Sequence, residues 1–226
     1  MEVSQTLYCS HYNNKQQILL VGEGDFSFSL CLARAFGTAT NMTATSLDTR
    51  VELELKYKDA KNNVEELERL GCTVVHGVNV HSMNTDYRVV RWILYDRIIF
   101  NFPHAGFHFG REHEIHTIIK QMFVYTCEWG HRNHQEVVRE FLRSAKEMVK
   151  YYGGEIHVTH KTAYPFASWN IKDLGSEMGL LFSREVVFGT WQYPGYSNKR
   201  GSGIHCDSSF PIGQSSTFMF RKRLFS

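Results

Sequence analysis

The chain of 226 residues has little of what marks a secreted, membrane-bound or multidomain protein. No apolar run approaches the length of a membrane span, and the first residues are polar, without the apolar segment of a secretory signal. Only four prolines are present, and no repeat or low-complexity linker divides the sequence. We therefore expect a polar N-terminal tail over residues 1–15 and a single domain over residues 16–226.

Cysteine and net charge are also low. The five cysteines are an odd number, lie far apart and form no Cys-x-x-Cys pair, which points to free thiols in a reducing, intracellular compartment. The net charge is only +2, so any nucleic-acid partner requires a local basic surface. Apolar residues nevertheless make up 42% of the chain, which is enough for a packed core.

Apolar stretches and helical patterns alternate along the chain. Strands are predicted at residues 17–21, 42–47, 73–76, 95–101, 155–160, 181–188 and 215–221. Helices are predicted at 26–36, 51–70, 112–127, 134–151 and 169–179. This alternation predicts a mainly parallel sheet covered on both faces. The last two strands have no helix between them, so we expect them to pair antiparallel.

The segment from Gln17 to Ser29 joins an apolar run, two glycines one residue apart and a helix start. Nucleotide-like cofactors rest on such turns, because glycine backbone approaches the ligand closely and the helix N-terminus offers unpaired N–H groups. We assign the whole loop to a cofactor site, with the Phe26 ring better suited to the core: Gly22, Glu23, Gly24, Asp25, Phe26 and Ser27. The alternative is a tight turn without a ligand.

Asp48 ends the second predicted strand. An acid at this place accepts hydrogen bonds from both hydroxyls of a ribose, and its charge disfavours a 2′-phosphate. The alternative is a surface acid just beyond a strand.

A second polar motif, Asn101-Phe102-Pro103-His104, follows the fourth predicted strand. The carboxyl ends of parallel strands share one edge of the sheet, so the motif is expected beside the same cleft. An imidazole can stack on a pyrimidine, hydrogen-bond to its carbonyls or take a proton. The alternative is a proline turn with a surface histidine.

Four histidines invite a metal-site interpretation: His104, His108, His113 and His116. No acid or cysteine completes a recognised ligand spacing, so no metal is expected. A partly aromatic lid over the substrate, including Phe107 and Phe109, is favoured instead.

The motifs together resemble the ribosomal-RNA uridine-N3 methyltransferase-like family, known as single domains in fungi and plants. The matching segments are residues 21–29, Thr45-Ser46-Leu47-Asp48, residues 96–106, residues 153–159, Trp169-Asn170-Ile171, Tyr193-Pro194-Gly195-Tyr196 and Lys199-Arg200-Gly201. They span residues 17 to about 220 in order. The resemblance implies an α/β, Rossmann-like class I S-adenosylmethionine-dependent methyltransferase fold. Its mainly parallel seven-stranded sheet would carry a C-terminal antiparallel strand pair.

The resemblance also implies S-adenosyl-L-methionine as the methyl donor and a uridine of large-subunit ribosomal RNA as a possible acceptor. Glu23 or Asp25 would then contact the donor's ammonium group, with a solvated loop acid as the alternative. Asn79 stands where the family usually has Asp, but its side-chain carbonyl can still accept a hydrogen bond from adenine.

The resemblance extends to the motif at residues 101–104, which is similar to the Asn/Asp-Pro-Pro-Tyr/Phe motif of methyltransferases that act on planar nitrogen atoms. Asn101, Phe102, Pro103 and His104 would form the catalytic set, with His104 in the place of the stacking aromatic. An RNA acceptor would favour the nucleus or nucleolus over the cytoplasm.

The loop over residues 189–214 combines aromatics, glycines and cations. Four of its residues are predicted to stack on RNA bases or contact phosphate: Tyr193, Tyr196, Lys199 and Arg200. The alternative is a solvated hairpin loop. Trp169 and Asn170 are assigned to a helix start and packing, and less to the acceptor pocket.

Two other functions stay open. One is a methyltransferase of small molecules on the same scaffold, with an acceptor pocket closed by aromatics. The other is a homologue that binds S-adenosylmethionine or RNA without catalysis, which the departure at Asn79 suggests. The sequence indicates no membrane association and does not define an oligomeric state.

Overall fold

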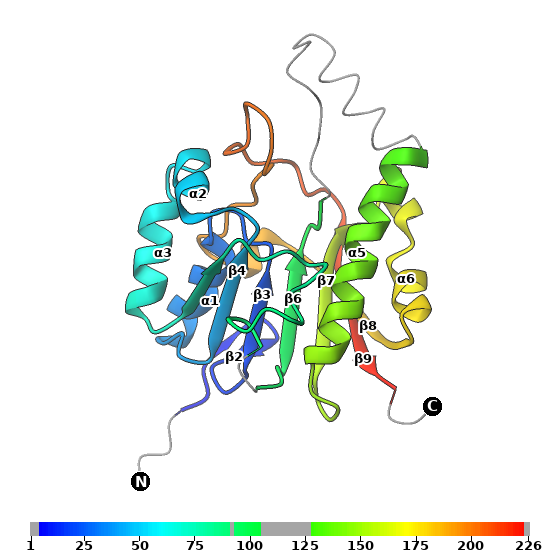
Figure 1. The fold of residues 1–226 in the computed structure, drawn as a ribbon, viewed down its shortest axis with the longest axis horizontal. Coiled ribbons are helices and arrows are strands. Elements are labelled where there is room, and N and C mark those ends of the chain that lie inside the picture. The colour runs from blue at the N-terminus through cyan, green and yellow to red at the C-terminus, as the bar shows by residue number, and fades with distance from the viewer. Residues whose placement is uncertain (1–4, 91–92, 105–127, 224–226) are drawn as a thin grey trace.

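A computed structural model describes residues 5–90, 93–104 and 128–223. Its central sheet has seven strands in the order β5-β4-β3-β6-β7-β9-β8 (Figure 1). The strands are β3 (Ile18–Val21), β4 (Met42–Ser46), β5 (Thr73–His76), β6 (Arg97–Asn101), β7 (Glu155–Lys161), β8 (Leu180–Val187) and β9 (Ser215–Lys222). The first five are parallel, and β9 runs antiparallel between β7 and β8. The predicted fold class is confirmed.

The described helices cover both faces of this sheet. They are α1 (Ser27–Phe36), α2 (Arg50–Lys56), α3 (Ala60–Arg69), α5 (Glu128–Met148) and α6 (Ile171–Glu177), with 3₁₀ turns η2 (Phe166–Trp169) and η3 (Thr190–Gln192). α1 and α3 pack over one core, and α5 and α6 over the other. No described helix has both the length and the apolar character needed to cross a bilayer.

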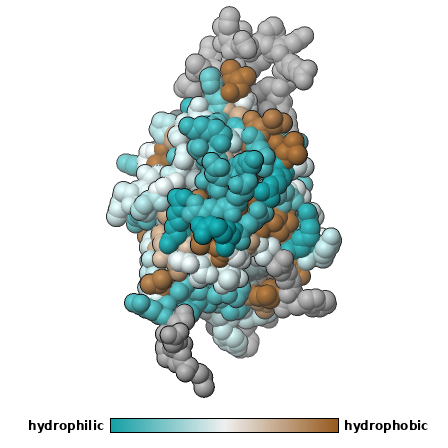
Figure 2. All heavy atoms as spheres, turned by 90° about the vertical axis from the view of Figure 1, so that its left-hand side faces the viewer, coloured by the Kyte–Doolittle hydropathy of each residue, from teal (hydrophilic) through white to brown (hydrophobic). Residues whose placement is uncertain are grey.

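The side of the molecule that carries α2 and α3 is mainly hydrophilic, with apolar side chains only in scattered places (Figure 2). Ion pairs between the helices contribute to this surface, including Arg34 with Glu66 at 2.6 Å and Arg50 with Glu68 at 2.9 Å. Such exposed pairs add little to stability, so the packing of the apolar helix faces holds these helices on the sheet.

One predicted helix, 51–70, is two helices in the structure. The capping box of Thr49 and Glu52 starts α2, but Tyr57 takes an extended conformation with φ −130° and ψ 118° and ends it. Tyr57 is only 2% exposed, and its hydroxyl lies near the loop glycines. Burial of this ring therefore outweighs the helical periodicity, and α3 starts afresh three residues later.

The N-terminal segment also differs from the predicted polar tail. Residues 8–13 form a hairpin of β1 (Tyr8–Cys9) and β2 (Tyr12–Asn13). Tyr12 is 1% exposed, and its hydroxyl lies 3.0 Å from Nδ1 of His157 on β7. An aromatic ring with a polar tip pairs in this way when buried, so the folded unit begins before residue 16.

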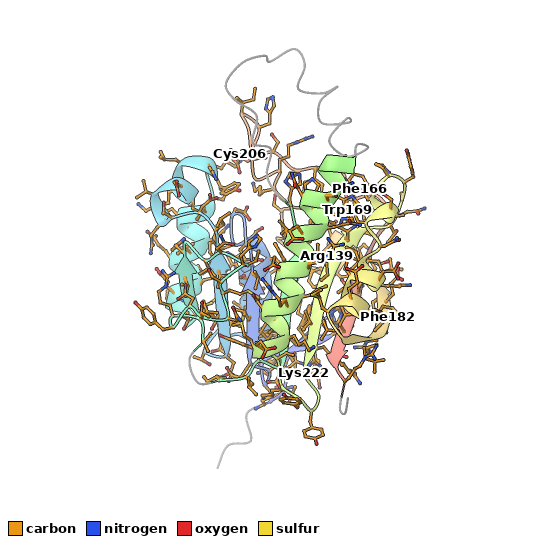
Figure 3. The ribbon with its side chains drawn as sticks, turned by 45° about the vertical axis from the view of Figure 1, so that its right-hand side comes forward. Arg139, Phe166, Trp169, Phe182, Cys206 and Lys222 are labelled. Carbon is orange, nitrogen blue, oxygen red and sulfur yellow. The ribbon has the colours of Figure 1, made fainter. Side chains whose placement is uncertain are left out.

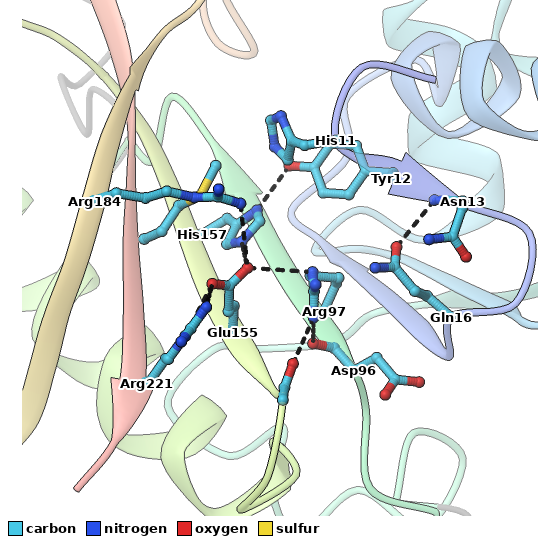
Figure 4. Close-up of polar contacts among 12 residues, drawn as sticks. His11, Tyr12, Asn13, Gln16, Asp96, Arg97, Glu155, His157, Arg184 and Arg221 are labelled. Carbon is cyan, nitrogen blue, oxygen red and sulfur yellow. Dashed lines mark hydrogen bonds and ion pairs between the residues drawn. The ribbon is translucent and has the colours of Figure 1, made fainter. Parts of the chain in front are cut away.

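This contact extends into a buried charge cluster at the amino ends of β6 and β7 (Figure 4). Glu155 is 1% exposed and lies 2.6 Å from Arg221, 3.4 Å from Arg97 and 3.3 Å from His157. Burial alone would raise the pKa of the Glu155 carboxyl, but hydrogen bonds from His157 and Arg221 outweigh it and lower this pKa. The cluster ties the hairpin and the C-terminal strand to the centre of the sheet.

Gly175 fixes how closely α6 approaches β9. A Cβ at this position would overlap the ring of Phe220. We expect Gly175→Ala to lower the free energy of unfolding by about 1–3 kcal/mol, because overpacking outweighs the better helix propensity of alanine. Urea unfolding measures this. Ser176→Ala on the exposed side is the control, and Phe220→Leu should recover part of the loss. An unchanged stability of Gly175→Ala would contradict the close packing.

Candidate active site

The loop over residues 22–26 joins β3 to α1 at the carboxyl edge of the sheet. Gly22 has φ 66°, and a Cβ there would lie 2.5 Å from the Phe100 ring. The turn therefore requires glycine both for its conformation and for its space. The N–H of Glu23 donates to the carbonyl of Thr45 at 2.8 Å, which fixes the loop to the end of β4.

The two loop acids bind the start of α1. Glu23 accepts hydrogen bonds from the backbone N–H of Ser29 at 3.0 Å and from its hydroxyl at 2.7 Å. Asp25 accepts a hydrogen bond from the N–H of Ser27 at 3.0 Å. Phe26, the residue between these two in the chain, is fully buried and has φ 62°. The acids thus satisfy N–H groups that the sequence interpretation had left for a ligand. Burial raises the pKa of Glu23 to about 7.

Lys199 closes one side of the glycine loop. Its Cβ lies 3.4 Å from where a Cβ of Gly24 would be. Its ammonium lies 2.7 Å from Asp207 and 3.4 Å from Asp25, and its side chain is only 7% exposed. Lys199 therefore holds the C-terminal loop on the glycine loop and is not free on the surface for an RNA phosphate.

Asp48 lies at the same edge, just beyond β4. Its carboxylate is paired with Lys56 of α2, and its carbonyl accepts a hydrogen bond from Gly77 at 3.2 Å. Asn79 is exposed, and its side-chain oxygen accepts from the N–H of His81 at 3.0 Å. The segments that follow β4 and β5 are thus tied together at the carboxyl edge of the sheet.

Asn101 ends β6, which pairs with β3 so that Phe100 lies opposite Val21. The side-chain nitrogen of Asn101 is buried and has no hydrogen-bond partner among residues 5–90, 93–104 and 128–223. A buried donor of this kind costs free energy unless something satisfies it. The side chain of Asn101 therefore has N–H groups that could donate a hydrogen bond to a ligand.

Phe102 and Pro103 turn inward. Phe102 has φ 50°, and its N–H donates to the carbonyl of Thr159 at 2.8 Å. Its ring packs edge-on against Phe188 at 5.6 Å and Phe210 at 5.4 Å, while Pro103 is buried. These two residues shape the chain between Asn101 and His104 and have little surface of their own.

His104 begins a cluster of rings that the sequence interpretation did not assemble. Its ring centre lies 4.5 Å from that of His134 on α5, and His134 stacks on Trp169 at 4.4 Å and 13°. His160 packs against Trp169 at 4.3 Å. Figure 3 places Trp169 beside Phe166 near the upper end of α5. The one signal for this cluster in the sequence was Trp169, and it is 1% exposed, as a packing residue would be.

The tyrosines of the C-terminal loop also face inward. Tyr193 is 1% exposed and stacks on Phe188 at 5.2 Å, and Tyr196 packs edge-on against Phe28 at 5.2 Å. Of the four predicted RNA contacts, Arg200 alone is exposed. Tyr193, Tyr196 and Lys199 therefore pack within the protein, and Arg200 is the member of the set that is accessible from outside.

Most of the histidines that were considered as metal ligands, and then judged not to bind a metal, lie outside the described residues. These are His108, His113 and His116, and Phe107 and Phe109 of the expected lid lie outside as well. Within the described residues, no group of three or more His, Cys, Asp or Glu side chains could hold a metal ion.

This sheet, glycine loop and edge motif define the class of S-adenosylmethionine-dependent methyltransferases with a Rossmann-like fold. A TehB-like S-adenosylmethionine-dependent methyltransferase from Corynebacterium glutamicum shares the fold at a TM-score of 0.50 and 14% identity. The match covers 95% of this chain and 84% of that one.

The chain belongs to the BMT5-like family, described as rRNA (uridine-N3-)-methyltransferase, whose signature matches residues 19–200. A protein of Arabidopsis thaliana, described only as uncharacterized, is 50% identical over 97% of this chain and 99% of its own length. The 25S rRNA (uridine(2634)-N(3))-methyltransferase of Saccharomyces cerevisiae is 26% identical over 84% of this chain and 67% of its own length.

Burial lowers the pKa of His160 from 6.5 to about 4. Below pH 6.5 the unfolded chain therefore takes up a proton that the folded protein excludes, so stability is lost as the pH falls toward 4. Between about pH 7 and pH 5, the wild type should lose up to about 2 kcal/mol more free energy of unfolding than His160→Gln. Urea unfolding at both pH values measures this difference. Equal losses would contradict it, and His205→Gln on the exposed loop should behave as the wild type.

Proposed function

We propose that this protein transfers the methyl group of S-adenosyl-L-methionine to N3 of a uridine in large-subunit ribosomal RNA. The observation that carries the proposal is the buried side-chain nitrogen of Asn101, which has no hydrogen-bond partner among the described residues and lies at the end of β6, the strand next to β3. Membership of the family supports the reaction, and the similarity to the yeast enzyme supports the acceptor.

The residues at the edge suit such a donor. The backbone over residues 22–24 would follow its methionine part, and the Asp48 carboxylate would accept hydrogen bonds from its ribose hydroxyls. Lys56 has to release Asp48 or share it, which an ammonium on a flexible four-carbon chain can do. The bound donor supplies an electrophilic methyl group.

Asn101 and His104 would act on the acceptor. The Asn101 amide can donate to a uracil carbonyl and so fix the plane of the base. Burial lowers the pKa of His104 to about 4, so its imidazole is neutral at pH 7 and has a nitrogen lone pair. The imidazole would accept the N3–H hydrogen bond, and the proton that N3 loses as its bond to the methyl group forms would pass through this nitrogen to solvent, because so weak a base does not retain it. Most of the rate enhancement would then come from holding N3 in line with the methyl group.

The first test separates the two sides of the site. Asn101→Ala and His104→Ala should lower turnover by about 100-fold or more, while donor affinity, measured by calorimetry, changes less than about threefold. Asp48→Asn should do the reverse and weaken donor affinity by about tenfold or more. Glu54→Gln on the exposed face of α2 is the control. Equal losses of turnover and donor affinity in the Asn101 and His104 variants would contradict their acceptor-side roles.

The second test identifies the product. Purified protein, donor and unmodified large-subunit ribosomal RNA should give 3-methyluridine on nucleoside mass analysis, with an initial rate lower by about fivefold or more for Asp48→Asn at a donor concentration near the wild-type Kd. Methylation of another atom, or of a small molecule alone, would overturn the assigned acceptor. Failure to bind S-adenosylmethionine or its demethylated product would favour the non-catalytic alternative.

A further inference from the structure

A second pocket lies beside the candidate site, at the carboxyl end of β7. It is a cavity of about 290 Å³ between β7, η2, α6 and β8. Its lining includes the cations Lys161 and Lys172, the acids Asp173 and Glu185, and the side chains of His160, Phe166 and Asn170. A pocket of this size has room for a nucleotide-sized ligand.

Among the residues that the structure describes, no acid forms an ion pair with Lys161 of this pocket. Its ammonium lies 4.7 Å from the ring centre of Phe166 and 4.9 Å from that of Phe210. Lys172, by contrast, is paired with Glu185 at 2.9 Å. Burial, and next the charge of Arg200, lower the pKa of Lys161, and no described acid opposes this shift. A negatively charged ligand would relieve both effects.

The pocket is continuous with the catalytic motif through aromatic rings. Phe210 touches Lys161 on one side and Phe102 at 5.4 Å on the other. β7 pairs with β6 so that Thr159 lies opposite Asn101, and Lys161 follows two residues later. A chain that placed one unit at Asn101 would therefore reach Lys161 with an adjacent unit.

Exposed side chains continue the same surface. Tyr164 is 85% exposed in the loop after β7, and Arg200 is exposed on the loop that carries Lys199. Cations that alternate with aromatic faces are what single-stranded nucleic acid requires, since phosphates pair with the cations and bases stack on the rings.

We propose that this pocket holds the nucleotide next to the acceptor in a single-stranded RNA, with its phosphate on Lys161 and a neighbouring base on Tyr164. The inference rests on the proposed function for its RNA substrate, but it assigns binding residues that the reaction itself does not require. It also replaces Tyr193, Tyr196 and Lys199, which the fold buries, as the RNA contacts.

The salt dependence of RNA binding tests the phosphate contact. Binding of a fluorescent oligouridylate of about ten nucleotides is followed by anisotropy from about 50 to 200 mM salt. Lys161→Met should weaken binding about fivefold at low salt and reduce the slope of log K against log salt by about 0.7. Tyr164→Ala should weaken binding by a similar factor without changing the slope. Lys61→Met, which removes the same charge from the exposed face of α3, should leave both quantities unchanged, and calorimetry should show unchanged donor affinity in all three variants.

The outcomes separate this inference from the proposed function. RNA binding with an unchanged slope in Lys161→Met overturns the pocket assignment, even if the wild type makes 3-methyluridine. If Lys161→Met reduces the salt slope but the wild type makes no 3-methyluridine, the pocket assignment is supported and the assigned acceptor is overturned. If the wild-type protein binds no oligouridylate, the assignment of the pocket to RNA is overturned. Displacement of the RNA by inorganic phosphate at low millimolar concentration, with no effect of Tyr164→Ala, would assign the pocket to free phosphate instead.

Discussion

The parallel pairing of β3 with both β4 and β6 is the constraint on which the candidate site depends. It brings the glycine loop, Asp48 and Asn101 to one edge although they are far apart in sequence. The strand order departs in opposite directions on the two sides of β3, and in open α/β sheets ligands bind outside the carboxyl ends of the strands at such a point. Chemistry placed elsewhere on this sheet would not lie at such a point, whereas a change of side chains at the edge changes the substrate without changing the fold.

The edge is held in place by ion pairs within the protein. Lys56 pairs with Asp48, and Lys199 bridges Asp25 and Asp207. A donor that carries both a positive and a negative charge can exchange with such pairs at little cost in desolvation, because the acids keep a cation nearby throughout. These ion pairs fix the positions of the acids, and under the proposed function this would reduce the conformational entropy lost when the donor binds.

The sequence predicted the fold well because strand and helix patterns are local, and their alternation alone implies a parallel sheet. It predicted the edge positions of Asp48 and Asn101 for the same reason. It did not predict that Tyr57 ends a helix, that Tyr12 ties an N-terminal hairpin to β7 or that Glu23 binds the first turn of α1. Each of these depends on a contact between distant segments, for which a single sequence contains no periodic signal. The same limit applies to the buried tyrosines of the C-terminal loop, whose composition is equally typical of an exposed RNA-binding hairpin.

The two sides of the edge differ in a way that follows from the topology. On the β4 side, short loops and lysine pairs define acids that suit a small, charged donor. On the β7 side, rings from the end of β6, from α5 and from β7 form a buried cluster with Trp169 of η2, and Tyr164 and Arg200 are exposed. Aromatic faces bind any base, and a few cations bind any phosphate, so this side alone cannot specify a sequence. Under the proposed function, selection of one uridine would have to come from the shape of the RNA that brings N3 within reach of Asn101. The modest net charge would favour such selection, because it limits non-specific binding to other RNA.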